Sequence, residues 1–178
     1  MIGTSVTVPA DRIDPDHLLV EFWMLPFPAA AEHVFPTMLD SACVAGTPER
    51  KSAGHRMHDV TSVIGLSGFV TGSIAFSVTR EASMAILERM TGIQAAEVDE
   101  LVCDCVGEMA NMIAGRAKIE LAPFELALGL PQVINGHDYS LVSPRWTIHE
   151  WLPLKTDLGD CALEVCFDLA PLRSLLRG

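Results

Sequence analysis

The stretch Val106–Lys118 reads V-G-E-M-A-N-M-I-A-G-R-A-K, and it combines a helical pattern with residues that weaken helices. Gly107, Asn111 and Gly115 each destabilise a helix interior by several tenths to about 1 kcal/mol relative to alanine. The apolar residues around them still recur at helical spacing, which predicts one long helix from about Val98 to Ile119. Residues that oppose the helix they belong to are the first candidates for a function.

The predicted helix divides into an apolar arc and one narrow polar stripe when its residues are placed at about 100° per residue. The apolar arc contains Val98, Leu101, Val102, Cys105, Met109, Met112 and Ile113. The polar stripe contains Asp104, Glu108, Asn111 and Gly115. The simplest interpretation is a solvated helix face. Such a face is normally filled with helix-favouring residues, however, so an asparagine and a glycine within it favour a docking surface that another backbone approaches closely.

Composition predicts one compact domain and argues against several kinds of partner. The chain has 178 residues, of which 49% are hydrophobic, and this is enough for a substantial core. Twelve basic and 23 acidic side chains give a formal net charge of −11. This charge opposes binding to nucleic acid or to an anionic membrane. The sequence shows no secretory signal and no apolar run of the roughly 18 residues that a spanning helix needs, so we expect a soluble, cytoplasmic protein.

The N-terminal third has a weaker pattern. Residues 1–25 contain several prolines and aspartates and are predicted to form an arm or an extra strand, the strand at Leu18–Met24. Apolar spacing predicts a helix between Pro28 and about Ala45. Pro36 lies inside that segment, so the helix should begin late or kink there. The polar segment Pro48–His58 is predicted to be a loop.

The rest of the chain predicts an α+β protein. Apolar, β-branched runs on both sides of Ser67-Gly68 indicate a β-hairpin, and a second helix is expected from Glu81 to Met90 with Gly92 as its C-cap. Further strands are expected after the long helix, one of them broken by Pro131 and the others at Tyr139–Val142, Trp146–Leu154 and Ala162–Leu169. Because helices and strands are segregated, we predict an antiparallel or mixed sheet packed against long helices.

Metal binding by this chain is not favoured. The five cysteines, which form no C-x-x-C pair, are interpreted as reduced core thiols; they are Cys43, Cys103, Cys105, Cys161 and Cys166. His55 and His58 form an H-x-x-H pattern, but they lie in a polar loop rather than on a helix. We therefore assign no metal ligands and no cofactor to the chain itself.

Three motifs together carry a family resemblance. They are I-G-L-S-G-F-V-T-G-S-I-A-F-S-V, then E-M-A-N within D-C-V-G-E-M-A-N-M-I-A-G-R-A-K, and then L-G-L-P-Q-V-I-N-G. In combination they resemble the CheX branch of the CheC/CheX/FliY phosphatases. The resemblance extends from about Pro26 to the C-terminus, so residues 26–178 are expected to form one CheX-like phosphatase domain with a CheC-like fold.

The resemblance implies an activity, a partner and site residues. Such proteins remove the phosphoryl group from the aspartate of a CheY-type response regulator in chemotaxis or two-component signalling. Their acidic and amide side chains, which correspond here to Glu108 and Asn111, insert into the regulator's active site. CheC relatives carry two such motifs, but the equivalent position in the first helix here is Phe35, so one working site per chain is expected. The magnesium ion belongs to the regulator.

The two stripe residues suit this chemistry. Hydrolysis of an acyl phosphate needs a water molecule held in line with the phosphorus, and the carboxamide of Asn111 can orient that water without adding charge. The carboxylate of Glu108 can pair with the lysine that receivers keep beside the phosphate. Asp104 and Gly115 are expected to belong to the same docking surface.

Two other functions and an oligomeric state complete the expectations. A CheX-like domain that only sequesters a receiver without catalysis is the main alternative. A structural subunit like those of the flagellar motor switch is another, although the sequence contains no appended segment of the kind those carry. We also expect a homodimer, because the strand-rich C-terminal third, with Trp146, Trp151 and Cys161–Phe167, would offer apolar strand edges.

Overall fold

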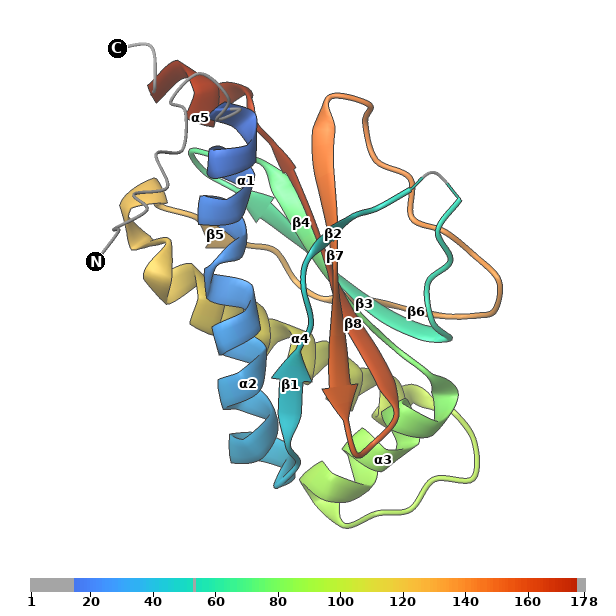
Figure 1. The fold of residues 1–178 in the computed structure, drawn as a ribbon. Coiled ribbons are helices and arrows are strands. Elements are labelled where there is room, and N and C mark those ends of the chain that lie inside the picture. Colours follow the sequence, from blue (N-terminus) through green and yellow to red (C-terminus); the bar gives the residue numbers. More distant parts are fainter. Residues whose placement is uncertain (1–14, 53, 176–178) are drawn as a thin grey trace, which may run out of the picture.

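The computed structural model describes residues 15–52 and 54–175. The described residues form helices packed with one sheet, and helices and strands follow one another in runs along the chain (Figure 1). The helices are α1 (Pro15–Met24), α2 (Pro26–Leu39), α3 (Arg80–Thr91), α4 (Glu100–Glu120), the short 3-10 helix η2 (Ala122–Phe124) and α5 (Ala170–Leu175). The strands are β1 (Cys43–Ala45), β2 (Glu49–Arg50), β3 (Val60–Ser67), β4 (Gly72–Val78), β5 (Ala127–Leu128), β6 (Gln132–Asn135), β7 (Thr147–Thr156) and β8 (Asp160–Asp168).

All strand pairs among the described residues are antiparallel, which confirms the α+β class. The order across the sheet is β1-β7-β8-β4-β3-β5; β2 also pairs with β7, and β6 with β3. The β3–β4 hairpin forms as predicted, with Ile64 opposite Ile74. Glycine is required at position 72, the first residue of β4, because a Cβ there would collide with the backbone of Cys166 on β8.

Helices α2 and α4 pack against each other on one face of the sheet. In Figure 1, α2 lies beside β1, and α4 crosses behind α2. Helix α4 also contacts β3, β4 and β6. The core lies between this helical layer and the sheet. The side chains of Phe27, Phe35, Phe76, Met109 and Phe167 are almost completely buried there. This packing fixes α4, the helix that carries the predicted site.

The opposite face of the sheet holds a buried polar cluster. Glu164 on β8 points away from the core, since strand side chains alternate between faces. Its carboxylate accepts hydrogen bonds from Lys51, and it lies 3.0 Å from Nδ1 of His149. The side chains of Lys51 and Glu164 are only 5% and 3% exposed, so each satisfies the charge that the other would otherwise leave buried. The cluster joins the segment after β2 to β7 and β8.

Three sequence-based expectations were wrong. Residues 15–24 form helix α1, where a strand at Leu18–Met24 had been expected; residues 1–14 of the predicted arm lie outside the described residues. Helix α2 begins at Pro26 rather than late, continues through Pro36 and ends at Leu39 rather than near Ala45. Pro36 removes one backbone donor from the helix, on its exposed side. The segment Tyr139–Val142 forms no strand.

The expected strand edges were also misplaced. The strands β7 and β8, which contain most of the apolar C-terminal residues, lie inside the sheet, and its edges are formed by β1 and β2 on one side and by β5 and β6 on the other. Trp146 is 71% exposed, but it precedes β7 rather than lying on an edge. Strands β7 and β8 therefore offer no free edge for a homodimer.

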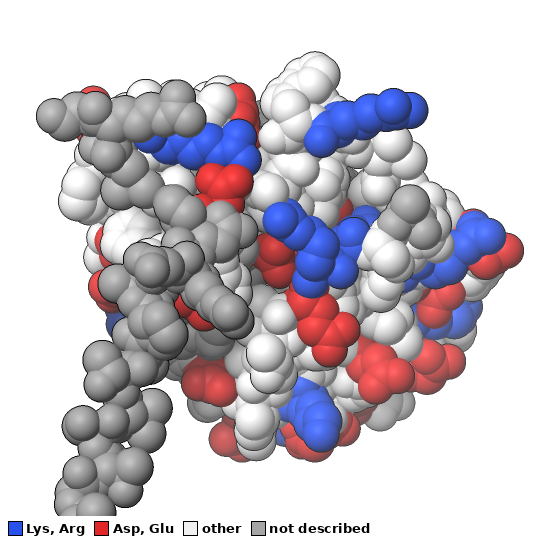
Figure 2. Space-filling view, turned by 45° about the horizontal axis from the view of Figure 1, so that its top comes forward, with Lys and Arg blue, Asp and Glu red and all other residues white. Residues whose placement is uncertain are grey.

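On the face shown in Figure 2, lysines and arginines are interspersed with acidic residues rather than gathered into one basic patch. Among the described residues, every helix is too short or too polar to cross a lipid bilayer.

Candidate functional site

Helix α4 is terminated by clear capping interactions. It begins after Asp99, whose carboxylate accepts a hydrogen bond from the backbone N–H of Val102 at 3.0 Å. The negative charge of Glu100 in the first turn and the positive charge of Lys118 in the last turn each interact favourably with the helix dipole. Its 21 residues form a rod about 31 Å long. The predicted helix is thus confirmed, with its start two residues later than expected.

One side of α4 is buried along its length. The buried residues lie against α2, α3 and the sheet; they are Val102, Cys105, Val106, Gly107, Met109, Ala110, Ile113, Ala114 and Ala117. Asp104, Glu108 and Asn111 are exposed, and Gly115 is half-buried. The structure therefore places all four stripe residues on the solvent side of one helix. It brings Glu108 and Asn111 one turn apart, where their Cβ atoms are about 5 to 6 Å from each other.

Glu108 and Asn111 are not engaged by their own protein. Within the described ranges, neither side chain takes part in a hydrogen bond or an ion pair with another residue of the chain. A carboxylate and a carboxamide that are held on a fixed helix, yet have no internal partner, are free to bind an external one. Together they can accept hydrogen bonds from a cation and also orient a water molecule.

The two glycines of α4 have different surroundings. A Cβ at Gly107 would lie 3.6 Å from Val133 and 3.7 Å from Pro131, which is ordinary van der Waals contact. Proline 131 and β6 therefore pack directly on the helix beside Glu108. A Cβ at Gly115 would meet nothing within 4 Å. The packing of this chain therefore does not require a glycine at position 115.

Two exposed apolar residues extend the stripe beyond what the sequence analysis found. Leu101 was assigned to the apolar arc, but it is 40% exposed, and Ile119 is 63% exposed. Both lie at spacings of three or four residues from the polar stripe. The signal was present in the sequence as the continuation of the 4, 3, 4 pattern in both directions. The polar stripe is therefore flanked by one exposed apolar side chain at each end.

Helix α2 offers no second site of this kind. Phe35 is fully buried, and its ring packs edge-on against Phe76 with centroids 6.0 Å apart. The position where a second amide was considered is thus part of the core. This supports one Glu–Asn pair per chain.

The five cysteines and the two histidines His55 and His58 lie in packed surroundings. Cys43, Cys105, Cys161 and Cys166 are buried and Cys103 is partly buried, all as free thiols. Burial raises the pKa of Cys161 to about 12, which keeps that thiol protonated and unreactive. His55 and His58 both pack near Trp151, at ring-centroid distances of 4.3 and 5.8 Å. Burial lowers the pKa of both histidines, so they are predominantly neutral at pH 7.

The fold and the exposed Glu–Asn pair define a protein of the CheC-like class. A crystal structure of a CheC-like superfamily protein from Shewanella sp. PV-4 superposes with a TM-score of 0.76 at 27% identity, covering 83% of this chain and 97% of that one. The model of the family described as chemotaxis phosphatase CheX matches residues 60–149, half of the chain, including β3, β4, α3 and α4. The chain belongs to the CheX family.

Two further relatives are similar to this chain. The CheY-P phosphatase CheX of Thermotoga maritima is 30% identical over 101 residues, which are 55% of this chain and 65% of that protein. The match thus spans just under two thirds of that relative's length. The CheX–CheY–BeF3–Mg2+ complex from Borrelia burgdorferi has a TM-score of 0.64 at 23% identity, with 82% of this chain and 97% of that chain covered, which supports the fold.

Proposed function

We propose that this chain dephosphorylates the phospho-aspartate of a CheY-type response regulator. The observation that carries the proposal is the exposed, internally unpartnered pair Glu108 and Asn111 on a helix that is buried on its other side. Family membership supports it, as does the name of the Thermotoga relative, a CheY-P phosphatase. In the Borrelia structure, a related fold is found in complex with CheY, BeF3 and Mg2+.

The roles of the two side chains follow from their chemistry. Asn111 would hold the attacking water in line with the phosphorus, because its carboxamide can accept one hydrogen bond from the water and leave the oxygen lone pair directed at the phosphoryl group. Glu108 would pair with the receiver's lysine, which fixes the register of the helix and offsets repulsion from the phosphoryl charge. Asp104 and Gly115 would lie in the same interface, one turn or so to either side.

The remaining components come from the partner. The phosphorylated aspartate and the Mg2+ that neutralises its charge both belong to the receiver, so this chain needs no cofactor of its own. A phosphatase for such receivers would work where they work, so we propose a cytoplasmic location. We also propose that two copies of this chain form a homodimer.

The main alternative is a receiver-binding adaptor that sequesters the regulator without turnover. The test is the release of phosphate from phosphorylated receiver when the chain is present at about one hundredth of the receiver concentration. A catalyst releases many equivalents of phosphate per chain, whereas an adaptor releases no more than the receiver does alone.

Replacement of Asn111 by alanine sharpens this test. Asn111→Ala should bind the phosphorylated receiver nearly as well as the unsubstituted chain but lose turnover by about 100-fold, which corresponds to about 2.7 kcal/mol of activation free energy. The variant should be at least as stable, because alanine favours the helix. Wild-type turnover by Asn111→Ala would contradict the catalytic role and leave α4 as a docking surface.

A further inference from the structure

The charged residues on the solvent side of α4 are separated by sign. On this side of the helix, three exposed carboxylates precede Asn111 at four-residue spacings; they are Glu100, Asp104 and Glu108. Lys118, which is half-buried, follows Asn111 by seven residues. At about 100° per residue, Asp104 and Lys118 each lie within about 20° of Asn111 around the helix. The side that carries Asn111 is therefore acidic toward the start of the helix and basic toward its end.

Helix stability alone does not account for this arrangement. The helix dipole favours an acidic residue in the first turn and a basic residue in the last turn, which covers Glu100 and Lys118. Asp104 lies one turn further in and has a carboxylate four residues away on either side, and like charges at this spacing destabilise a helix. Arg116 and Glu120 lie about 140° and 180° from Asn111 around the helix, so they do not balance these charges. A cation from outside the chain would relieve the repulsion around Asp104.

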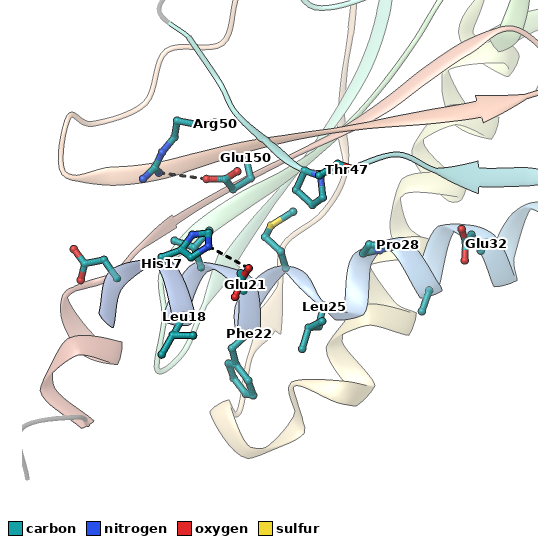
Figure 3. A pocket seen from close by; sticks show the side chains of 15 residues that line it. His17, Leu18, Glu21, Phe22, Leu25, Pro28, Glu32, Thr47, Arg50 and Glu150 are labelled. Carbon is teal, nitrogen blue, oxygen red and sulfur yellow. Dashed lines mark ion pairs between the residues drawn. The ribbon is translucent and has the colours of Figure 1, made fainter. Parts of the chain in front are cut away.

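The charges along this side of α4 have no internal partner. Within the part of the chain that the structure describes, the side chains of the three carboxylates and of Lys118 take part in no hydrogen bond or ion pair. The groove of about 1050 Å³ beside α1 differs in this respect. Figure 3 shows two pairs there, His17–Glu21 and Arg50–Glu150, whose nitrogen and oxygen atoms lie 3.2 and 3.5 Å apart. The charges of α4 are thus available to an external partner, whereas these pairs satisfy one another.

The surface is hollowed beside the acidic end of α4. An open hollow of about 450 Å³ adjoins the start of the helix and is lined by Val98, Asp99, Glu100, Cys103, Asp104 and Asn135. No group of three or more His, Cys, Asp or Glu side chains among the described residues could hold a metal ion. Carboxylates spread along a hollow suit a lysine or an arginine instead, because such a side chain needs room for its long stem as well as an acceptor for its charge.

A receiver centred on Asn111 would cover both ends of this arrangement. Asp104 and Lys118 each lie about 10.5 Å from Asn111 along the helix axis, at 1.5 Å per residue. A standard interface of about 800 Å² per partner is roughly 30 Å across, so it extends about 15 Å in each direction from its centre. Both charged ends therefore lie within the reach of the partner whose phosphoryl group faces Asn111.

We propose that Asp104 and Lys118 fix the direction in which the receiver docks along α4. The carboxylate of Asp104 meets a basic side chain of the receiver in the hollow, and the ammonium group of Lys118 meets a carboxylate of the receiver. A receiver docked the other way round would face like charges at both ends, so complementary charge selects the direction that brings the phosphoryl group to Asn111. This inference rests on the proposed phosphatase function. Asp104 and Lys118 are positioning residues, because neither reaches the reacting atoms.

The test reverses the charges at the two ends of α4 in the full chain. The single variants are Asp104→Lys and Lys118→Glu, and the double variant Asp104→Lys/Lys118→Glu keeps the net charge while reversing its direction along the helix. Lys155→Glu/Asp160→Lys is the matched control, because these two residues are exposed and lie opposite each other on β7 and β8. Steady-state dephosphorylation of a CheY-type receiver gives kcat and KM. Titration with the same receiver loaded with beryllofluoride and Mg2+ gives Kd, and chemical denaturation reports whether each variant is folded.

We expect each single variant to raise KM and Kd by about fivefold or more and the double variant to raise them further, with the loss in KM rather than in kcat. These increases should shrink at high ionic strength, because salt screens charge pairs. The control should leave all three values unchanged. Attraction or repulsion by net charge alone gives a different pattern. The two single variants would then shift Kd in opposite directions, since one makes the chain less negative and the other more negative, and the double variant would restore it.

Opposite shifts in the two single variants, or recovery in the double variant, would overturn the docking direction and leave the phosphatase function in place. Unchanged KM and Kd in folded variants would do the same. If a reversal variant does not fold, Asp104→Asn and Lys118→Gln replace it, and both should raise KM and Kd by a smaller factor. No turnover and no binding by the unsubstituted chain would overturn the proposed function itself.

Discussion

Glu108 is the residue whose charge should decide docking. If it pairs with the receiver's lysine, Glu108→Ala should weaken receiver binding as well as turnover. Loss of a charge pair also changes the dependence on ionic strength, because salt screens such pairs. Binding measured between low and high salt should therefore respond less steeply in Glu108→Ala than in the unsubstituted chain. Glu108→Gln is the control for shape. Equal salt dependence in all three proteins would argue against the lysine pairing.

Gly115 should show a conflict between stability and function. Nothing lies within 4 Å of a Cβ at this position, so Gly115→Ala should raise the free energy of unfolding by up to about 1 kcal/mol. The added methyl group would occupy space that the receiver approaches, and KM for the phosphorylated receiver should rise several-fold.

The comparison for Gly115→Ala is Gly107→Ala on the same helix. Its methyl group would make ordinary contacts with Pro131 and Val133, inside the protein and away from the receiver. Gly107→Ala should therefore leave KM unchanged. Chemical denaturation of both variants gives the free energy of unfolding, and steady-state kinetics gives KM. Similar KM values for the two would remove Gly115 from the docking surface.

At the residue scale, the sequence predicted which residues share the solvent side of α4, while their role in a site stays a prediction. The pattern of Asp104, Glu108, Asn111 and Gly115 depends only on the periodicity of one helix, which local sequence specifies. Leu101 was misassigned because periodicity places a residue on an arc, while the width of the buried arc depends on the neighbouring helices.

Among the elements, α2 should behave as a core helix despite its resemblance to a second site. Phe35→Ala removes a fully buried ring that packs against Phe76, and it should lower the free energy of unfolding by about 3 to 5 kcal/mol. The dephosphorylation rate per folded molecule should stay the same, because Phe35 does not reach the receiver. Thermal or chemical unfolding gives the first value, and activity scaled to the folded fraction gives the second. Loss of activity in fully folded protein would show that α2 has a direct role.

The elements with clear local signals were predicted, and those without them were not. Helix α3 has a Thr79 N-cap and a left-handed Gly92 at its end, and the sequence placed both of its ends within a residue. Helix α1 was predicted to be a strand because H-L-L-V-E-F-W-M is almost continuously apolar and rich in bulky residues, without a clear period. The surrounding protein decides its conformation, because Trp23 and Met24 are buried against the core. The buried Lys51–Glu164 contact is likewise invisible in sequence, since the two residues are 113 positions apart.

For the whole molecule, the edges of the sheet are the places where a second copy can add. Strand β1 is an edge strand, and Val44 on it is 59% exposed. An unpaired strand edge with exposed apolar side chains favours association between sheets. We therefore expect light scattering at tens of micromolar protein to give twice the mass of one chain. A charge on that edge, as in Val44→Glu, should shift the mass toward one chain. A clean monomer before any substitution would contradict the prediction.

The setting of α4 also determines which partner controls the timing of the reaction. Glu108 and Asn111 project from the middle of a helix whose other side is packed along its length, and no segment among the described residues has to close over them before the proposed chemistry. Under the proposed function, the slow rearrangements that accompany catalysis would belong to the loops of the receiver. If the proposed function holds and two receivers are dephosphorylated at different speeds, exchanging their loops should exchange the speeds as well. A mutation that stiffens α4 should leave the ranking of receivers unchanged.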